Sequence, residues 1–167
     1  MTDTTGALDL AARQMTGALG KIGGGAADPA APPIAVEQVP PRELFFELLA
    51  LGLGNLFTIV PLAAPLFERS ILKAVVGHLP DTESSKLIVR ADDWIRLEGL
   101  VKGQEGQKAY SLSSLSLAIL TTETPGGSIG NLLAQAYDCY VRQAHTPELR
   151  QVTRKLAAIF LNMMVRS

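Results

Sequence analysis

The strongest constraint on the fold is a polar stretch with two glycines, residues 102–108, between two short apolar runs. The runs are Leu100-Val101 and Ala109 to Leu112, and their spacing around a glycine-containing tip predicts a β-hairpin. Helical patterns flank this hairpin, from Asp81 to Gly99 and from Ser113 to Leu120. The block therefore predicts a helix, two short strands and a second helix within about forty residues.

The helix before the hairpin has an apolar face and recognisable ends. Within residues 87–95 the apolar side chains recur with helical spacing. A short oxygen-bearing side chain at Asp81, Thr82 or Ser84 can cap the first turn by accepting from its free N–H groups. We expect Gly99 to end the helix, because glycine tolerates the positive φ found at many helix ends.

Two segments around the hairpin match a known pattern. They are Trp94 to Val101 (WIRLEGLV) and Tyr110 to Ser113 (YSLS), followed by Leu117 and Leu120. This block resembles the winged helix-turn-helix of the MarR and PadR families of bacterial regulators. The resemblance implies a mainly α fold with a small β-hairpin, in which a winged helix-turn-helix (core motif 66–121) carries extra N- and C-terminal helices.

The resemblance also implies where a partner would bind. In winged helices that bind DNA, the outward face of the recognition helix enters the major groove and the wing touches the backbone. The candidate contacts to double-stranded DNA or to a protein partner are Lys86, Val89, Arg90, Asp93 and Arg96 in the helix, and Lys102, Gln104, Gln107 and Lys108 in the wing.

The charge of this block weighs against strong DNA binding. Residues 66–121 hold equal numbers of basic and acidic side chains, and the whole chain has a formal net charge of −1. A neutral block forfeits much of the affinity that phosphate contacts supply. Two hypotheses therefore stand: a dimeric DNA-binding transcriptional regulator or accessory factor, or a non-catalytic winged-helix module for protein–protein interaction without DNA binding.

The composition divides the chain at residue 40. Residues 1–39 are rich in Ala, Gly and Pro, which predicts a flexible tail, although apolar residues within 8–19 allow one short amphipathic helix. Residues 40–167 are expected to form a single winged-helix-like helical domain, with helices at 42–57 and 66–79 before the central block.

A membrane location is not expected. Residues 48–67 lack charged side chains and would just span a bilayer, but two prolines, two glycines and Asn55 interrupt them. Helices buried in a small core explain the same residues. The amino terminus lacks the basic and then apolar pattern of a secretory signal, so we expect a cytoplasmic protein.

Two helices are predicted after the central block, within residues 128–166. Thr146-Pro147-Glu148 is a typical helix start, with a capping hydroxyl, a proline at the first position and an acid in the first turn. The last helix carries an apolar stripe that fits either core packing or a homodimer seam. The stripe consists of Leu149, Val152, Leu156, Ile159 and Met163.

The sequence offers little for catalysis or metal binding. His78 and His145 are the only histidines, and neither has an acid or a cysteine at ligand spacing. Cys139 is the only cysteine and is expected to be a buried, small apolar residue. Asp92 and Asp93 are adjacent in a helix and point in different directions. We therefore predict that the protein is not an enzyme, with no catalytic residue, metal site or cofactor.

Overall fold

The computed structural model describes residues 4–22, 40–60, 62–103 and 109–166. Within these ranges the chain is mainly helical, with two small antiparallel sheets of two strands each, as expected of a mainly α protein with a small hairpin. In chain order the elements are α1 (Thr4–Ile22), α2 (Pro41–Thr58), α3 (Arg69–Val76), α4 (Asp81–Leu97), β1 (Val101–Lys102), β2 (Ser111–Leu112), α5 (Ser114–Leu120), β3 (Glu123–Thr124), β4 (Gly127–Ser128), α6 (Ile129–Val141) and α7 (Pro147–Arg166).

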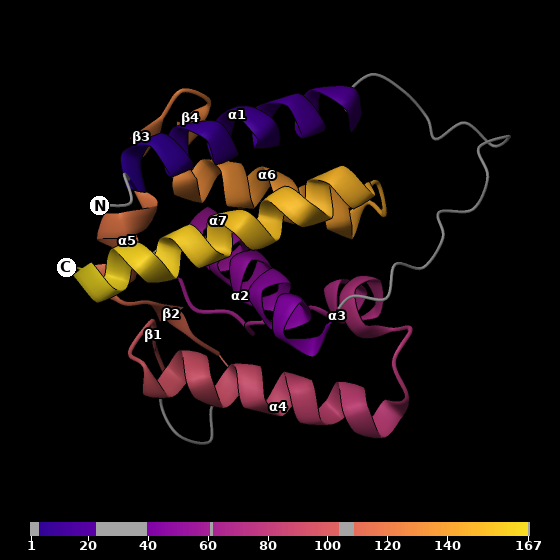
Figure 1. The fold of residues 1–167 in the computed structure, drawn as a ribbon. Helices are drawn as coiled ribbons and strands as arrows, with labels where there is room; N and C mark the ends of the chain where they lie inside the picture. The colour runs from indigo at the N-terminus through magenta and orange to yellow at the C-terminus, as the bar shows by residue number, and fades with distance from the viewer. Residues whose placement is uncertain (1–3, 23–39, 61, 104–108, 167) are drawn as a thin grey trace, which may run out of the picture.

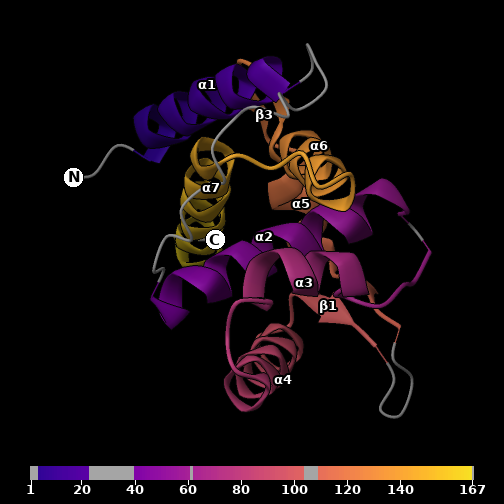
Figure 2. The same ribbon diagram turned by 90° about the vertical axis from the view of Figure 1, so that its right-hand side faces the viewer.

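Helix α2 occupies the centre of the molecule. It packs against α6 and α7 on one side and against α3 and α4 on the other (Figures 1 and 2). Because neighbours surround it, its sequence is nearly all apolar rather than amphipathic. Its fully buried leucines are Leu44, Leu48, Leu49, Leu51, Leu53 and Leu56. Much of the uncharged stretch at 48–67 therefore lies inside the core, and no helix in the described ranges is long and apolar enough to cross a membrane.

Helix α6 crosses α2 at very close range. A Cβ atom added to Gly54 would lie 2.5 Å from the carbonyl oxygen of Leu133, so α6 crosses α2 almost backbone to backbone. Glycine is required there because any side chain would have to occupy the space of a main-chain atom.

Helix α1 corrects the expectation of a flexible tail. Residues Thr4–Ile22 form a helix that packs on α7 and α6, at the opposite edge of the molecule from α4 (Figure 1). Composition misled the prediction because alanine is a weak hydrophobe but the best helix former, and its small side chain lets helices approach closely. The buried face consists of Leu8, Ala11, Ala12, Met15 and Ala18. Residues 23–39 lie outside the described ranges.

The strands after α4 are confirmed. β1 pairs antiparallel with β2, with Val101 opposite Leu112 and Lys102 opposite Ser111. Gly99 has a φ of 75°, the positive value expected at the end of the helix. The predicted tip, residues 104–108, lies outside the described ranges.

Tyr110, just before β2, joins three parts of the fold. Its backbone forms an antiparallel bridge with Ala64 in the α2–α3 connection, with N–H···O distances of 2.8 and 2.9 Å. Its hydroxyl donates to the Oδ2 atom of Asp92 on α4, at 3.4 Å. The order across this sheet is therefore the Ala64 segment, β2 and β1.

The predicted helix caps have mixed outcomes. Thr146 caps α7 as predicted, by accepting from the N–H of Leu149 at 3.1 Å. Ser113, for which no cap was predicted above, caps α5 by accepting from the N–H of Ser116 at 3.2 Å. The cap predicted for α4 at Asp81, Thr82 or Ser84 is wrong. Pro80 holds the N-cap position, where no side-chain cap bond forms in this described segment. Asp81 and Glu83 instead place negative charge beside the free N–H groups of the first turn.

The apolar stripe of α7 serves the core of the monomer. Leu149, Val152 and Leu156 are buried within the chain, and Ile159 and Met163 pack partly buried against the same core. Three of the five side chains are therefore used in the core of the monomer, while Ile159 and Met163 remain partly exposed.

We predict that Gly54→Ala lowers the free energy of unfolding by about 1–3 kcal/mol, because the new methyl group meets the Leu133 carbonyl. Urea unfolding followed by circular dichroism measures the change. Gly17→Ala is the matched control: it lies inside α1, and no described atom would lie within 4 Å of its Cβ. That variant should gain about 0.5–1 kcal/mol. Equal effects at the two sites would contradict the close crossing.

Candidate functional site

The outward face of α4 is the main candidate binding surface. Helix α4 lies along one edge of the molecule in both ribbon views (Figures 1 and 2). Ala91 and Ile95 turn inward and are buried. Lys86, Val89 and Arg90 are exposed. Because residues four apart lie one turn apart on the same face, Lys86 and Arg90 present two positive charges side by side.

Asp93 and Arg96, two other predicted contacts on α4, form an ion pair that neutralises their charges. The Nη2 atom of Arg96 lies 2.9 Å from Oδ1 of Asp93, and both side chains remain substantially exposed. The hydrogen bond from Arg96 to Asp93 raises the pKa of the guanidinium. Arg96 is therefore already paired with a carboxylate, and it offers a phosphate less than Lys86 or Arg90 does.

One residue predicted to bind from the wing lies within the described residues. Lys102 is exposed on β1, which follows the C-terminal end of α4. The other predicted wing contacts, Gln104, Gln107 and Lys108, lie outside the described ranges. The structure thus groups Lys86, Val89 and Arg90 on one helix face and places Lys102 on the neighbouring strand.

Sequence reasoning missed Leu97, the last residue of α4. Its side chain is 77% exposed, and Val89 on the same helix is 57% exposed. Leu97 follows Arg90 and Asp93 by seven and four residues, so it continues the outward stripe. The signal was present in the sequence, because Leu97 falls out of phase with the buried positions Ala91 and Ile95. The outward face is therefore part basic and part apolar.

Acidic residues also flank this surface. Helix α4 and its C-cap carry more acids than bases, with Asp81 and Glu83 exposed in the first turn and Glu98 exposed at the end. Asp92 turns toward Tyr110; burial raises the pKa of this carboxyl, against the lowering effect of the Tyr110 hydrogen bond. The potential along α4 is consequently mixed.

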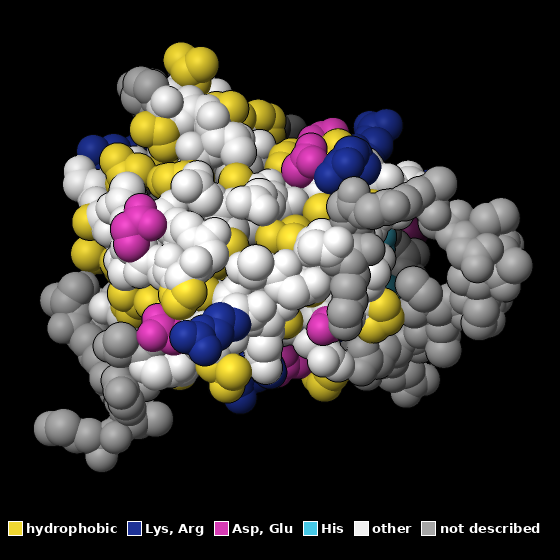
Figure 3. All heavy atoms as spheres, turned by 90° about the horizontal axis from the view of Figure 1, so that it is seen from above, with side chains coloured by type: hydrophobic (Ala, Val, Ile, Leu, Met, Phe, Trp, Pro, Cys, Tyr) yellow, Lys and Arg dark blue, Asp and Glu magenta, His cyan; other side chains and the backbone are white. Residues whose placement is uncertain are grey.

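The opposite edge of the molecule does not offer a better basic surface. Seen from above, across α1, the charged side chains that are drawn in colour are scattered, with Lys and Arg beside Asp and Glu (Figure 3). Among the described residues in this view, positive charge forms no continuous patch.

A cluster of charged and aromatic residues lies under the surface where α2, α6 and α7 meet. Glu47 of α2 is 0% exposed, and both of its carboxylate oxygens accept from Nε of Arg150, at 3.2 and 3.1 Å. The Nε atom of Arg154 lies 3.3 Å from Oε1 of Glu47. The ring of His145 stacks on that of Tyr140, with 4.9 Å between centroids. Sequence reasoning missed this cluster, although Glu47 is the lone acid within an apolar run.

Burial sets the protonation behaviour of this cluster. It raises the pKa of the Glu47 carboxyl, while Arg150 and Arg154 act to lower it. Burial and the positive charge of Arg150 together lower the pKa of His145. The pKa of Tyr140 is raised by burial and by the Glu47 charge, so its hydroxyl stays protonated. The cluster therefore joins α2 to α7 through one carboxylate and two guanidinium groups.

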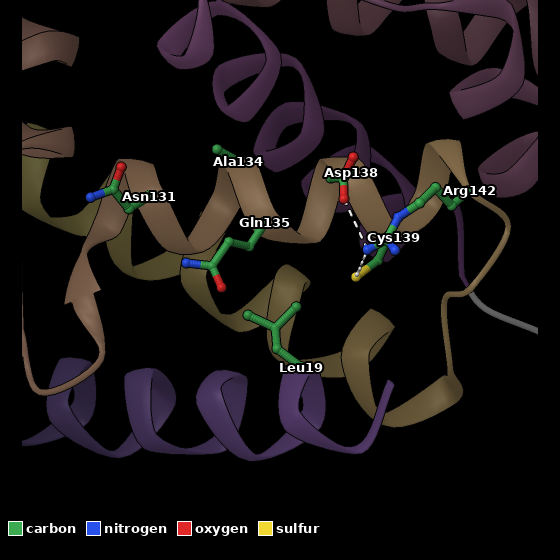
Figure 4. A pocket seen from close by; sticks show the side chains of 7 residues that line it. All are labelled: Leu19, Asn131, Ala134, Gln135, Asp138, Cys139 and Arg142. Atoms are coloured by element: carbon green, nitrogen blue, oxygen red, sulfur yellow. Dashed lines mark hydrogen bonds and ion pairs between the residues drawn. The ribbon is translucent and has the colours of Figure 1, made fainter. Parts of the chain in front are cut away.

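A cavity of about 400 Å³ lies between α1 and α6 (Figure 4). Asp138 and Arg142 form an exposed ion pair at 2.9 Å along its rim. Cys139 lies beside them, buried as predicted, and burial raises the pKa of its thiol, which disfavours a reactive thiolate. The remaining lining residues are Leu19, Asn131, Ala134 and Gln135.

The described ranges hold no group of three or more His, Cys, Asp or Glu side chains that could bind a metal ion. His78 is exposed, whereas His145 belongs to the buried cluster. No family model, curated protein or solved structure matches this chain.

We predict that Arg150→Met destabilises the protein by about 3–5 kcal/mol at pH 8, because Glu47 loses its main partner while remaining buried. Without Arg150 the pKa of Glu47 rises further above its ordinary value of 4.5. A carboxyl group whose pKa is higher in the folded than in the unfolded protein lowers the free energy of unfolding as the pH rises through these two pKa values. The destabilisation caused by Arg150→Met should therefore be smaller at pH 5 than at pH 8. Loss of the Arg150 charge also raises the pKa of His145, which favours the folded state at pH 5 and so reduces the destabilisation there.

Urea unfolding at pH 5 and pH 8 measures both effects. Arg142→Met is the matched control, because Arg142 pairs with Asp138 on the surface with side chains 61% and 63% exposed. Its loss should cost less than about 1 kcal/mol at either pH. A deficit for Arg150→Met that is small, or the same at both pH values, would show that the buried pair does not stabilise the fold in this way.

Proposed function

We propose that this protein is a winged-helix DNA-binding protein, a bacterial transcriptional regulator or accessory factor that acts as a dimer. The observation that carries the proposal is the order of elements around Tyr110. A helix (α2), an extended segment at Ala64, two helices (α3 and α4) and a two-stranded sheet follow one another, and the Ala64 segment pairs beside β2. This order supports the proposal because a winged helix-turn-helix has the same succession of elements, in which α4 would be the recognition helix.

The exposed basic residues support DNA as the partner. Lys86 and Arg90 project from one face of α4, and long basic side chains there can reach phosphates or base edges in a major groove. Lys102 on β1 adds a third positive charge near the end of α4. The proposed dimer would use the exposed end of α7, where Val165 is 85% exposed.

A second candidate function is a winged-helix module that binds a protein. The exposed Val89 and Leu97 favour it, because interface cores are enriched in apolar side chains and depleted in charge. The excess of acids on α4 favours it too, since each acid opposes a phosphate contact. In this alternative, the same outward face of α4 contacts a protein surface.

The DNA proposal predicts that Lys86→Ala and Arg90→Ala each weaken binding to a labelled random-sequence duplex. Each lost phosphate contact should also reduce the slope of log affinity against log salt by about one. Fluorescence anisotropy of the full-length chain, titrated at several salt concentrations, measures both quantities. Arg13→Ala, at an exposed position of α1 on the opposite edge, is the matched control and should bind as the unmodified chain does.

Glu83→Gln provides a test in the opposite direction. Glu83 is exposed in the first turn of α4, and removing its charge should strengthen duplex binding if this helix faces the phosphates. No binding of any duplex at low salt would remove DNA as the partner. Co-purification of a protein that Arg90→Glu and Leu97→Ser both release would then establish the second candidate.

A further inference from the structure

The cavity between α1 and α6 lies beside α1, at the opposite edge of the molecule from α4 (Figure 1). Its volume of about 400 Å³ is within the range typical of ligand sites. Helix α6 supplies one wall, and α1 supplies the other through Leu19. The side chains of Gln135 and Leu19 extend toward each other across the space between the two helices (Figure 4).

Four polar side chains follow one another along the wall that α6 supplies. They are Asn131, Gln135, Asp138 and Arg142, and their spacing of three or four residues places them on one face of the helix. All four are exposed to solvent. The carboxamides of Asn131 and Gln135 each offer N–H donors and an oxygen acceptor to a bound molecule.

The spacing of these two carboxamides matches that of an extended peptide. Residues four apart on a helix have Cβ atoms about 6 Å apart. In an extended chain, alternate residues direct their N–H and C=O groups to the same side, at a separation of about 6–7 Å. A carboxamide can donate to the C=O and accept from the N–H of one residue. Asn131 and Gln135 can therefore bind two alternate residues of one extended segment.

The ionic end of the wall has no net charge. The Nη2 atom of Arg142 lies 2.9 Å from Oδ2 of Asp138 and 3.9 Å from Sγ of Cys139. Because the two charges are adjacent and opposite, an ion of either sign in the cavity is attracted by one and repelled by the other. Such an ion would lose hydration without gaining a net opposite charge. The lining therefore favours an uncharged occupant that forms hydrogen bonds.

The remaining lining is apolar. Leu19 and Ala134 are partly buried, and Cys139 is buried. An aliphatic side chain placed against them would be removed from water, which favours binding. A peptide supplies both kinds of group, because its backbone is polar and its side chains can be apolar.

We propose that this cavity binds an uncharged, extended segment of a polypeptide partner, whose backbone exchanges hydrogen bonds with the Asn131 and Gln135 carboxamides. An aliphatic side chain of the segment lies against Leu19 and Cys139. An internal segment fits this lining better than a chain end, because a chain end carries a charge. The site does not depend on the identity of the partner at α4.

A peptide titration of the full-length chain tests the proposal. The probe is the blocked tripeptide N-acetyl-Ala-Leu-Ala methylamide, and backbone amide NMR signals of the labelled protein report its binding. The same peptide with a free carboxylate, or with a free amine, is the matched control for charge, and each should bind several-fold more weakly. An ester in place of the Leu–Ala amide removes one N–H donor, and it should weaken binding about two- to tenfold.

Two variants place the binding in this cavity. Asn131→Ala and Gln135→Ala should each weaken binding of the blocked peptide about two- to tenfold. The matched controls are Asn162→Ala and Gln151→Ala, at exposed positions of α7, which should leave binding unchanged. The ester should also cost less affinity in at least one of the two cavity variants than in the unmodified chain, because the lost hydrogen bond is then already absent.

The proposal is overturned if the blocked peptide does not bind at millimolar concentration, or if either charged form binds as tightly. Equal binding of the amide and the ester, or unchanged binding by both cavity variants, would also overturn it. None of these results bears on duplex binding, which is measured without the peptides.

Discussion

The burial of α2 on nearly all sides is the constraint on which the rest of the structure depends. A helix surrounded by α3, α4, α6 and α7 must be apolar around its circumference, and the backbone of α6 can reach it only because position 54 is glycine. Glu47 is the buried charged residue of this helix, and it joins α2 to α7 by pairing with Arg150 and Arg154 from successive turns. We expect apolar packing to supply most of the stability and this carboxylate to favour one alignment of α2 with α7.

The same arrangement explains how the chain can present α4. Only Ala91 and Ile95 of α4 are fully buried, and Leu87, Ile88 and Trp94 pack partly buried against the core. Most of its surface is therefore free to carry polar and apolar side chains for a partner. The core formed by α1, α2, α6 and α7 carries the stability that α4 and the β1–β2 pair cannot provide alone.

Local signals explain what the sequence predicted well. The pairing of the two short strands, the cap at Thr146 and the positive φ at Gly99 depend on a few neighbouring residues, so the pattern alone identifies them. The failures arose where distant segments meet. Glu47 and Arg150 are separated by 103 residues, and α1 is stabilised by faces of α6 and α7 that lie more than a hundred residues away. On α4 the exposed basic residues were predictable, but the Asp93–Arg96 pairing depends on side-chain conformation.

Tyr110 gives the proposed binding surface a mechanical property. Its backbone pairs with Ala64, and its hydroxyl donates to Asp92. The strand, the α2–α3 connection and α4 therefore meet at a single residue. A Cβ on Gly103 would meet the Tyr110 ring, which leaves the ring little room to swing toward β1. Tyr110 thereby connects α4 to β2 and to the α2–α3 connection. A partner that contacts both Arg90 and Lys102 would therefore have to match the spacing between these two side chains.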